Sequence, residues 1–225
     1  PVDRQAVKTY IMPYDSVVIR EAILREFYRG GQTFFVCPRI SDIKEVLPKL
    51  TELMPEVKIV VAHGQMSPKA LEEIMTDFYN KKFHLLLSTS IVESGIDIAE
   101  ANTMIIHRAD KFGLSALYQL RGRVGRYKHQ AYAYLFIPGA LAVSSDARQR
   151  LTAIEELSEL GAGFQLAARD MEIRGVGNML GHNQSGHIAS IGFDLYLKLI
   201  EDTVKELKGE ETQNNLVEPE INLQV

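Results

Sequence analysis

The stretch KIVVAHGQMSPKALEEIMTDFYNKKFHLLLST at residues 58–89 decides the fold class. It begins and ends with the apolar runs Lys58–Ala62 and Leu85–Thr89, which are typical of strands buried on both faces of a parallel sheet. Ser67–Asn80 between them predicts a helix, because it opens with a serine suited to the N-cap and a proline suited to the first helical position. Its apolar face is formed by Leu71, Ile74, Met75 and Phe78. The stretch therefore predicts a right-handed β–α–β crossover.

The same alternation of strands and helices extends over residues 1–138. The other expected strands are Val7–Met12, Thr33–Cys37, Thr103–His107 and Tyr132–Ile137. Further helices are expected over Asp15–Tyr28 and Ser41–Leu53, capped by Asp15 and Ser41, and from Leu114 to a break at Gly122. Repeated crossovers of this kind predict an open α/β sheet.

The sequence changes character after residue 138. We expect a helical hairpin and loop extension over 139–190, a helix packing back on the domain over 191–208, and an acidic linker over 209–225 leading to a further domain. The expected elements are an acidic amphipathic helix over Ser144–Leu160, a short helix over Phe164–Asp170, a loop over 174–186, a helix over Phe193–Leu207 and a strand-like end over 221–225.

The composition excludes several classes of protein. Hydrophobic residues make up 46% and charged residues 24% of the chain, as in ordinary globular proteins. No apolar run approaches the roughly 18 residues of a membrane helix. The single cysteine, Cys37, excludes a disulfide framework and a zinc site built on cysteine pairs, and it fits a reducing, cytoplasmic location.

Positive charge is concentrated in the first part of the chain. Residues 1–138 carry a net charge of +3 and residues 139–225 a net charge of −7. Residues 111–128 hold five positive charges and no acidic residue. A solvated surface would explain this run, but a local basic stripe also binds phosphates, because salt screening makes the field local.

Common nucleotide and metal motifs are absent from the sequence. It contains no G-x-x-x-x-G-K-[ST] phosphate loop and no acidic magnesium motif, so we do not expect this chain to bind a nucleotide and its magnesium unaided. The six histidines are scattered, and no metal site is predicted.

Gln119–Arg126, with the sequence QLRGRVGR, places three arginines and two glycines within eight residues. Glycines allow close approach of a ligand, and guanidinium groups are planar donors to phosphate oxygens. Arg123 and Arg126 together suit an arginine-finger role in phosphoryl transfer. Surface ion pairs at a helix end are the alternative.

Ser88–Ile98, with the sequence STSIVESGIDI, directly follows a buried strand. Ligands in open α/β sheets bind beyond the carboxyl ends of strands, where Thr89 and Ser90 would offer hydroxyls and backbone amides to a phosphate. Gly95 suits a positive φ, and Asp97 suits a ribose hydroxyl or an arginine. Simple helix and turn caps are the alternative.

Taken together, in this order and spacing, the two stretches resemble motifs V and VI of the superfamily 2 helicases. FFVCPRISDI at 34–43 occupies the place of motif IV, and HGQM at 63–66 matches the segment that follows it. Residues 161–187 resemble the translocation motif of bacterial transcription-repair coupling factors and RecG-type helicases, and VEPEINL at 217–223 resembles the linker that follows it in the coupling factors.

The resemblance implies a RecA-like second motor domain with open, mostly parallel sheet and helices on both faces, and it assigns roles to individual residues. Arg123 and Arg126, positioned by Gln119, would contact the γ-phosphate of ATP, which binds with Mg mainly on an absent first domain. The other implied residues are Asp97, Gly95 and Glu93 for the nucleotide; Thr89, Ser90, Arg39 and Gln65 for double-stranded DNA; and Arg174, Gln184 and Arg169 for translocation.

The implied function is one half of an ATP-dependent DNA translocase that displaces stalled RNA polymerase and recruits excision-repair proteins through other domains, with no membrane partner. The fragment alone is expected to be inactive. Two alternatives stay open: the corresponding half of a RecG-like branch-migration helicase, and a helicase-like scaffold without catalysis.

Overall fold

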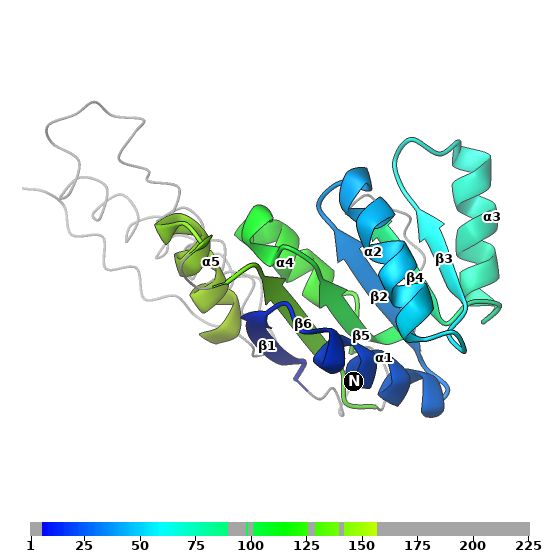
Figure 1. Ribbon diagram of the computed structural model, residues 1–225, viewed down its shortest axis with the longest axis horizontal. Coiled ribbons are helices and arrows are strands. Elements are labelled where there is room, and N and C mark those ends of the chain that lie inside the picture. The colour runs from blue at the N-terminus through cyan, green and yellow to red at the C-terminus, as the bar shows by residue number, and fades with distance from the viewer. Residues whose placement is uncertain (1–5, 90–97, 99–100, 126–128, 140–141, 157–225) are drawn as a thin grey trace, which may run out of the picture. The chain divides into compact units, whose positions relative to one another are not determined.

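The computed structural model describes residues 6–89, 98, 101–125, 129–139 and 142–156. The chain divides into two compact units, residues 1–174 and 175–225, and every described residue lies in the first. All six expected strands form one parallel sheet in the order β1-β6-β5-β2-β4-β3 (Figure 1). They are β1 (Lys8–Pro13), β2 (Gln32–Cys37), β3 (Ile59–Ala62), β4 (Leu85–Thr89), β5 (Ala101–Ile106) and β6 (Tyr132–Ile137). The predicted open α/β sheet is confirmed.

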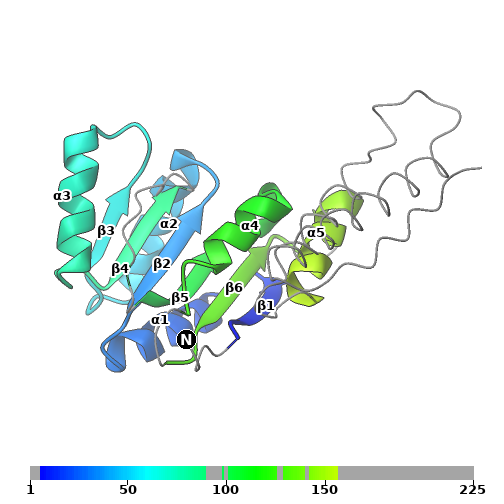
Figure 2. The same ribbon diagram turned by 180° about the vertical axis from the view of Figure 1, so that it is seen from behind.

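Helices cover both faces of the sheet (Figures 1 and 2). They are α1 (Ser16–Tyr28), α2 (Ile40–Leu53), α3 (Pro68–Tyr79), α4 (Leu114–Arg121), α5 (Ser145–Glu156) and the short 3-10 turn η1 (Ala109–Lys111). The apolar side chains of α1 and α2 join one core cluster, and those of α3, α4 and α5 join the other. The sheet is therefore the middle of three layers, as its continuous apolar strands predict.

Side-chain capping explains where α1 and α3 begin. The Asp15 carboxylate accepts hydrogen bonds from the backbone N–H groups of Val17 and Val18, and the Ser67 hydroxyl accepts one from Ala70, as predicted. The predicted cap at Ser41 is wrong. Helix α2 begins at Ile40, after an Arg39 N-cap that makes no side-chain capping bond, so Ser41 lies inside the first turn.

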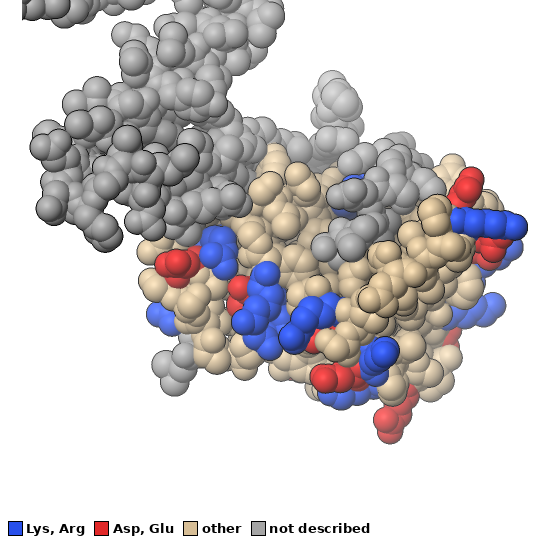
Figure 3. All heavy atoms as spheres, turned by 90° about the horizontal axis from the view of Figure 1, so that it is seen from above, with Lys and Arg blue, Asp and Glu red and all other residues tan. Residues whose placement is uncertain are grey.

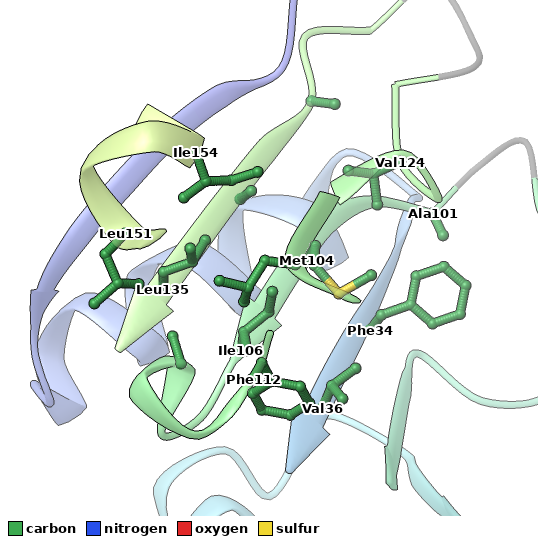
Figure 4. Packing of buried hydrophobic residues seen from close by; sticks show 14 of the residues in the cluster. Phe34, Val36, Ala101, Met104, Ile106, Phe112, Val124, Leu135, Leu151 and Ile154 are labelled. Carbon is green, nitrogen blue, oxygen red and sulfur yellow. The ribbon is translucent and has the colours of Figure 1, made fainter. Parts of the chain in front are cut away.

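The core has one cluster on each side of the sheet. Successive residues of β4 alternate between them, with Leu86 in one cluster and Leu85 and Leu87 in the other, and all three are 0% exposed. Leu151 and Ile154 bring α5 into the first cluster, beside Leu135 of β6 (Figure 4). The helix predicted after residue 138 thus packs on the same core as the sheet.

Several predictions fall on residues that are not described. These are the last four residues of the helix expected over 144–160 and every element expected beyond it. In the part of the chain that is described, no helix is long and apolar enough to cross a membrane.

Candidate functional site

Three of the predicted DNA-contacting residues lie at the edge of the sheet formed by the carboxyl ends of the strands. Cys37 of β2 pairs in register with Thr89 at the end of β4, and Ala62 of β3 pairs with the preceding Ser88. Arg39 follows β2 by two residues, and Gln65 follows β3 by three. Because the strands are parallel, the structure brings Thr89, Arg39 and Gln65 to this carboxyl edge.

The Thr89 side chain is buried although it carries a polar hydroxyl group. Thr89 is 5% exposed, and its hydroxyl oxygen has no hydrogen-bond partner among the described residues. Nδ1 of His63, which follows the neighbouring strand β3, is also buried, and no group in the described part of the chain hydrogen-bonds to it. Unpaired buried polar atoms are rare in folded proteins because each costs about 1–3 kcal/mol. Two such atoms thus lie at the adjoining ends of β3 and β4.

Arg39 and Gln65 are exposed. Two nitrogens of the Arg39 guanidinium donate to the Asp42 carboxylate, Nε at 3.3 Å and Nη2 at 3.1 Å. Figure 3 looks down on the molecule from the side toward which the strand arrows of Figure 1 point, and it shows Lys and Arg side chains spread across this view with Asp and Glu among them. The edge presents cationic donors to solvent.

The ends of β2 and β5, which are neighbours in the sheet, lie side by side at the carboxyl edge. The chain leaves β2 for α2 on one face and leaves β5 for α4 on the other. Such a divergence is the topological switch point at which α/β sheets bind ligands. Sequence reasoning missed this position because the neighbours in a sheet are not adjacent in the chain.

His107 and Arg108 follow β5 at this point. Nδ1 of His107 is buried, and none of the residues that the structure describes hydrogen-bonds to it. Burial lowers the pKa of its imidazole, Arg108 and Lys49 lower it further, and the carboxylates of Asp42 and Asp110 oppose the shift. Burial thus favours the neutral form of the His107 imidazole at the end of β5.

The predicted arginine segment lies at the opposite edge, where the strands begin. Helix α4 crosses from the end of β5 to the start of β6, as its place in the chain requires. Gly125 has φ +81, and a Cβ there would lie 3.0 Å from Val7 Cγ2 and 3.3 Å from Ala131 Cβ. Val7 and Ala131 directly precede β1 and β6. Gly125 is thus packed against the amino edge of the sheet, in a conformation that favours glycine.

Parts of the Gln119–Arg126 and Ser88–Ile98 stretches lie near Ala101 at this amino edge. Val124 is buried beside Ala101, the first residue of β5 (Figure 4). The backbone N–H of Ala101 donates to the carbonyl of Ile98, so the end of the Ser88–Ile98 stretch lies here too. Arg123 is half-buried between Gly122 and Val124, whereas Gln119 is exposed on α4. Of the predicted nucleotide residues that the structure describes, Arg123 therefore lies at the edge opposite Thr89, two residues before Gly125.

Two arginines that were not predicted as site residues attach α5 to the domain. The Arg121 side chain is buried, its Nη1 donates to the carbonyl of Ile154 at 2.7 Å, and burial lowers its pKa. Arg150 of α5 donates from Nε to the carbonyl of Phe112 at 3.3 Å and from Nη2 to that of Asp110 at 3.4 Å. All three acceptors are backbone carbonyls, which leave no signal in the sequence.

The remaining predicted residues lie outside the described part of the chain. They are Ser90, Glu93, Gly95, Asp97, Arg126, Arg169, Arg174 and Gln184. Asp97 immediately precedes Ile98, and Arg126 immediately follows Gly125, so both adjoin the amino edge in sequence. Among the described residues, no group of three or more His, Cys, Asp or Glu side chains could hold a metal ion.

Part of the chain matches a known protein family. Residues 17–128 match the helicase conserved C-terminal domain. The chain carries a superfamily 2 helicase C-terminal domain. Its similarity to proteins that contain such a domain extends beyond the matched residues, over nearly the whole chain.

Two transcription-repair-coupling factors are similar to this helicase chain. That of Myxococcus xanthus is 52% identical over 223 residues, which are 99% of this chain and 18% of the relative. That of Escherichia coli is 52% identical over 209 residues, or 93% of this chain and 18% of the relative. The chain therefore spans about a fifth of the length of these relatives.

Solved structures support the same fold. RecG bound to a three-way DNA junction has a TM-score of 0.68 and 35% identity, and the match covers 88% of this chain and 26% of that one. Yeast Dbp5 bound to RNA has a TM-score of 0.51 and 15% identity, covering 76% of this chain and 46% of that one. The second likeness shows the fold alone.

Proposed function

We propose that this chain is the second motor half of an ATP-dependent double-stranded DNA translocase. The observation that carries the proposal is the separation of two predicted ligand sets to opposite edges of one sheet. Thr89, Arg39 and Gln65 lie at the carboxyl edge, and Arg123 lies at the amino edge. One domain can then contact DNA and a nucleotide at the same time without competition between them.

Arg123, at the amino edge, and Arg126, three residues later in the chain, contact the γ-phosphate of ATP, which binds with Mg on a partner motor domain. Guanidinium donors stabilise the negative charge that develops on a transferring phosphoryl group. The tight packing of Gly125 against Val7 and Ala131 fixes the backbone between the two arginines. Gln119 positions them, while Asp97, Gly95 and Glu93 link the cleft to β5.

Thr89, Arg39 and Gln65 at the carboxyl edge, together with Ser90, contact the phosphates of duplex DNA. Phosphate contacts fix the position of a protein on the duplex but carry no direct sequence information. Binding is therefore independent of sequence, and it weakens steeply as salt rises.

Coupling between the two edges runs through α5. Arg121 is two residues from Arg123, and its bond to the carbonyl of Ile154 reaches the last turn of α5. Closure of the cleft on ATP moves Arg123, and the buried Arg121 carries that movement to α5. The predicted translocation residues Arg169, Arg174 and Gln184 follow α5 in the chain.

In the full-length protein, this cytoplasmic motor displaces stalled RNA polymerase and couples transcription to excision repair through other domains. The 52% identity to two transcription-repair-coupling factors supports that role. A branch-migration role is the second candidate, supported by the 35% identity to RecG. Displacement of a stalled polymerase favours the first role, and regression of a model fork without such displacement favours the second.

Single substitutions in the full-length motor test the proposal. Arg126→Ala should abolish ATP turnover and leave DNA binding largely intact, because a finger acts on the transition state. Arg174→Ala should keep much of the ATPase and lose translocation. Arg20→Ala, at an exposed position of α1, is the matched control and should change neither activity. Normal turnover in Arg126→Ala would refute the assignment, and a scaffold would show no turnover in any variant.

A further inference from the structure

Two arginine–aspartate pairs of the same design stand on neighbouring strand ends. After β2, the Arg39 guanidinium is bound to Asp42 by two hydrogen bonds. After β5, the Arg108 guanidinium is bound to Asp110 from Nε to Oδ1 and from Nη2 to Oδ2, both at 3.0 Å. Because β2 and β5 are paired in the sheet, the two pairs lie side by side at the carboxyl edge.

In each pair the carboxylate is turned inward and the guanidinium outward. The side chains of Asp42 and Asp110 are 9% and 6% exposed, whereas those of Arg39 and Arg108 are 68% and 31% exposed. A guanidinium has five N–H donors, and a bidentate carboxylate uses two of them. Each arginine is therefore held rigid and still has donors left for a second anion.

The backbone at Arg108 shows that its position matters. Arg108 has φ +51 and ψ +52, the left-handed conformation, which costs a residue with a side chain about 1–2 kcal/mol. Such strain gathers at functional sites, where the surrounding structure maintains it. Here the bonds to Asp110 and the hydrogen bond from the Lys111 N–H to the Arg108 carbonyl hold the turn.

The charges around the two pairs favour an anion. Lys111 Nζ lies 4.0 Å from Asp110 Oδ2, and its side chain is 57% exposed. The two arginines and this lysine thus outnumber the two buried carboxylates. A planar guanidinium already fixed by a carboxylate loses little further entropy when it binds a phosphate oxygen.

We propose that Arg108 is a DNA backbone contact, which together with Arg39 holds the phosphates of one strand of duplex DNA across the β2–β5 switch point. This inference rests on the proposed function and extends its DNA edge by one strand, from β2 to β5. Asp42 and Asp110 act as positioning residues, and Lys111 adds to the local field.

The salt dependence of DNA binding tests the proposal, measured with the full chain by fluorescence anisotropy of a labelled duplex of random sequence. Each lost phosphate contact lowers the slope of log K against log salt by about 0.9. Arg108→Gln and Arg39→Gln should each lower it by that amount, and the double variant by about twice as much. Lys58→Gln removes the same charge from an exposed position at the amino edge and should leave the slope unchanged.

A second variant guards against loss of folding. Arg108→Gln removes both guanidinium hydrogen bonds from the buried Asp110 carboxylate and leaves it only the 4.0 Å contact with Lys111. Arg108→Gln/Asp110→Asn, which removes both charges, should therefore show the same reduced slope with a thermal midpoint nearer that of the wild type. A wild-type slope in this folded double variant would overturn the role of Arg108 alone. An absence of salt-dependent binding by the wild-type chain would overturn the DNA half of the proposed function as well.

Discussion

Replacing Gly125 by alanine tests how the arginine segment is held. At φ +81 an alanine costs about 1–2 kcal/mol in the left-handed region. The new Cβ would also lie 3.0 Å from Val7 Cγ2 and 3.3 Å from Ala131 Cβ, so these neighbours must yield by a few tenths of an ångström. We assign this crowding about 1 kcal/mol, the low end for overpacking. The expected loss for Gly125→Ala is then about 2–3 kcal/mol of the free energy of unfolding.

Gly30 supplies the matched control. It has a similar φ of +77, and a Cβ there meets nothing within 4 Å. Gly30→Ala should therefore show the conformational cost alone, about 1–2 kcal/mol. Urea unfolding of both variants, followed by circular dichroism, measures the difference. If Gly125→Ala is no more destabilising than Gly30→Ala, close packing does not fix this segment and the reasoning is refuted.

Three further predictions concern buried groups. Arg121→Met removes a buried charged hydrogen bond to the carbonyl of Ile154 and should lower the free energy of unfolding by about 1.5–3 kcal/mol in urea titrations. Arg121→Lys should lower it less, and negligible losses in both variants would contradict the anchoring of α5 by Arg121. Burial, with the Asp42 charge, raises the pKa of the Cys37 thiol from 9.0 to about 12, so a thiol reagent at pH 8 should label it slowly until the chain unfolds. Because the thiol ionises at a lower pH in the unfolded chain than in the folded one, the free energy of unfolding should fall as the pH rises from 9.0 toward about 12. Burial lowers the pKa of His107 below 6.5, so its contribution to stability is present above pH 6.5 and is lost as the pH falls; His107→Gln should flatten that acid limb, and an unchanged limb would count against it.

The fold was predictable because each layer leaves a local signal. Continuous apolar runs such as Leu85–Thr89 indicate strands covered on both sides, and Asp15 and Ser67 mark helix starts through their own side chains. The prediction at Ser41 failed because α2 begins one residue earlier, at Ile40, after an Arg39 whose side chain bonds Asp42 instead of capping the helix.

The organisation of the site was less accessible to sequence. Thr89, Arg39, Gln65, Gln119 and Arg123 were predicted individually, but their division between two edges depends on strand order, which is a property of the assembled sheet. Arg108 became visible only through its left-handed backbone and the pairing of β2 with β5. Tertiary neighbours of this kind have no fixed spacing along the chain.

DNA-stimulated ATP hydrolysis tests the central claim most directly, measured first with this chain alone and then with a separately expressed phosphate-loop motor domain. The account predicts no turnover by the chain alone and turnover on mixing, abolished by Arg126→Ala. Turnover by the chain alone would contradict it, because a complete nucleotide site would then lie within these 225 residues.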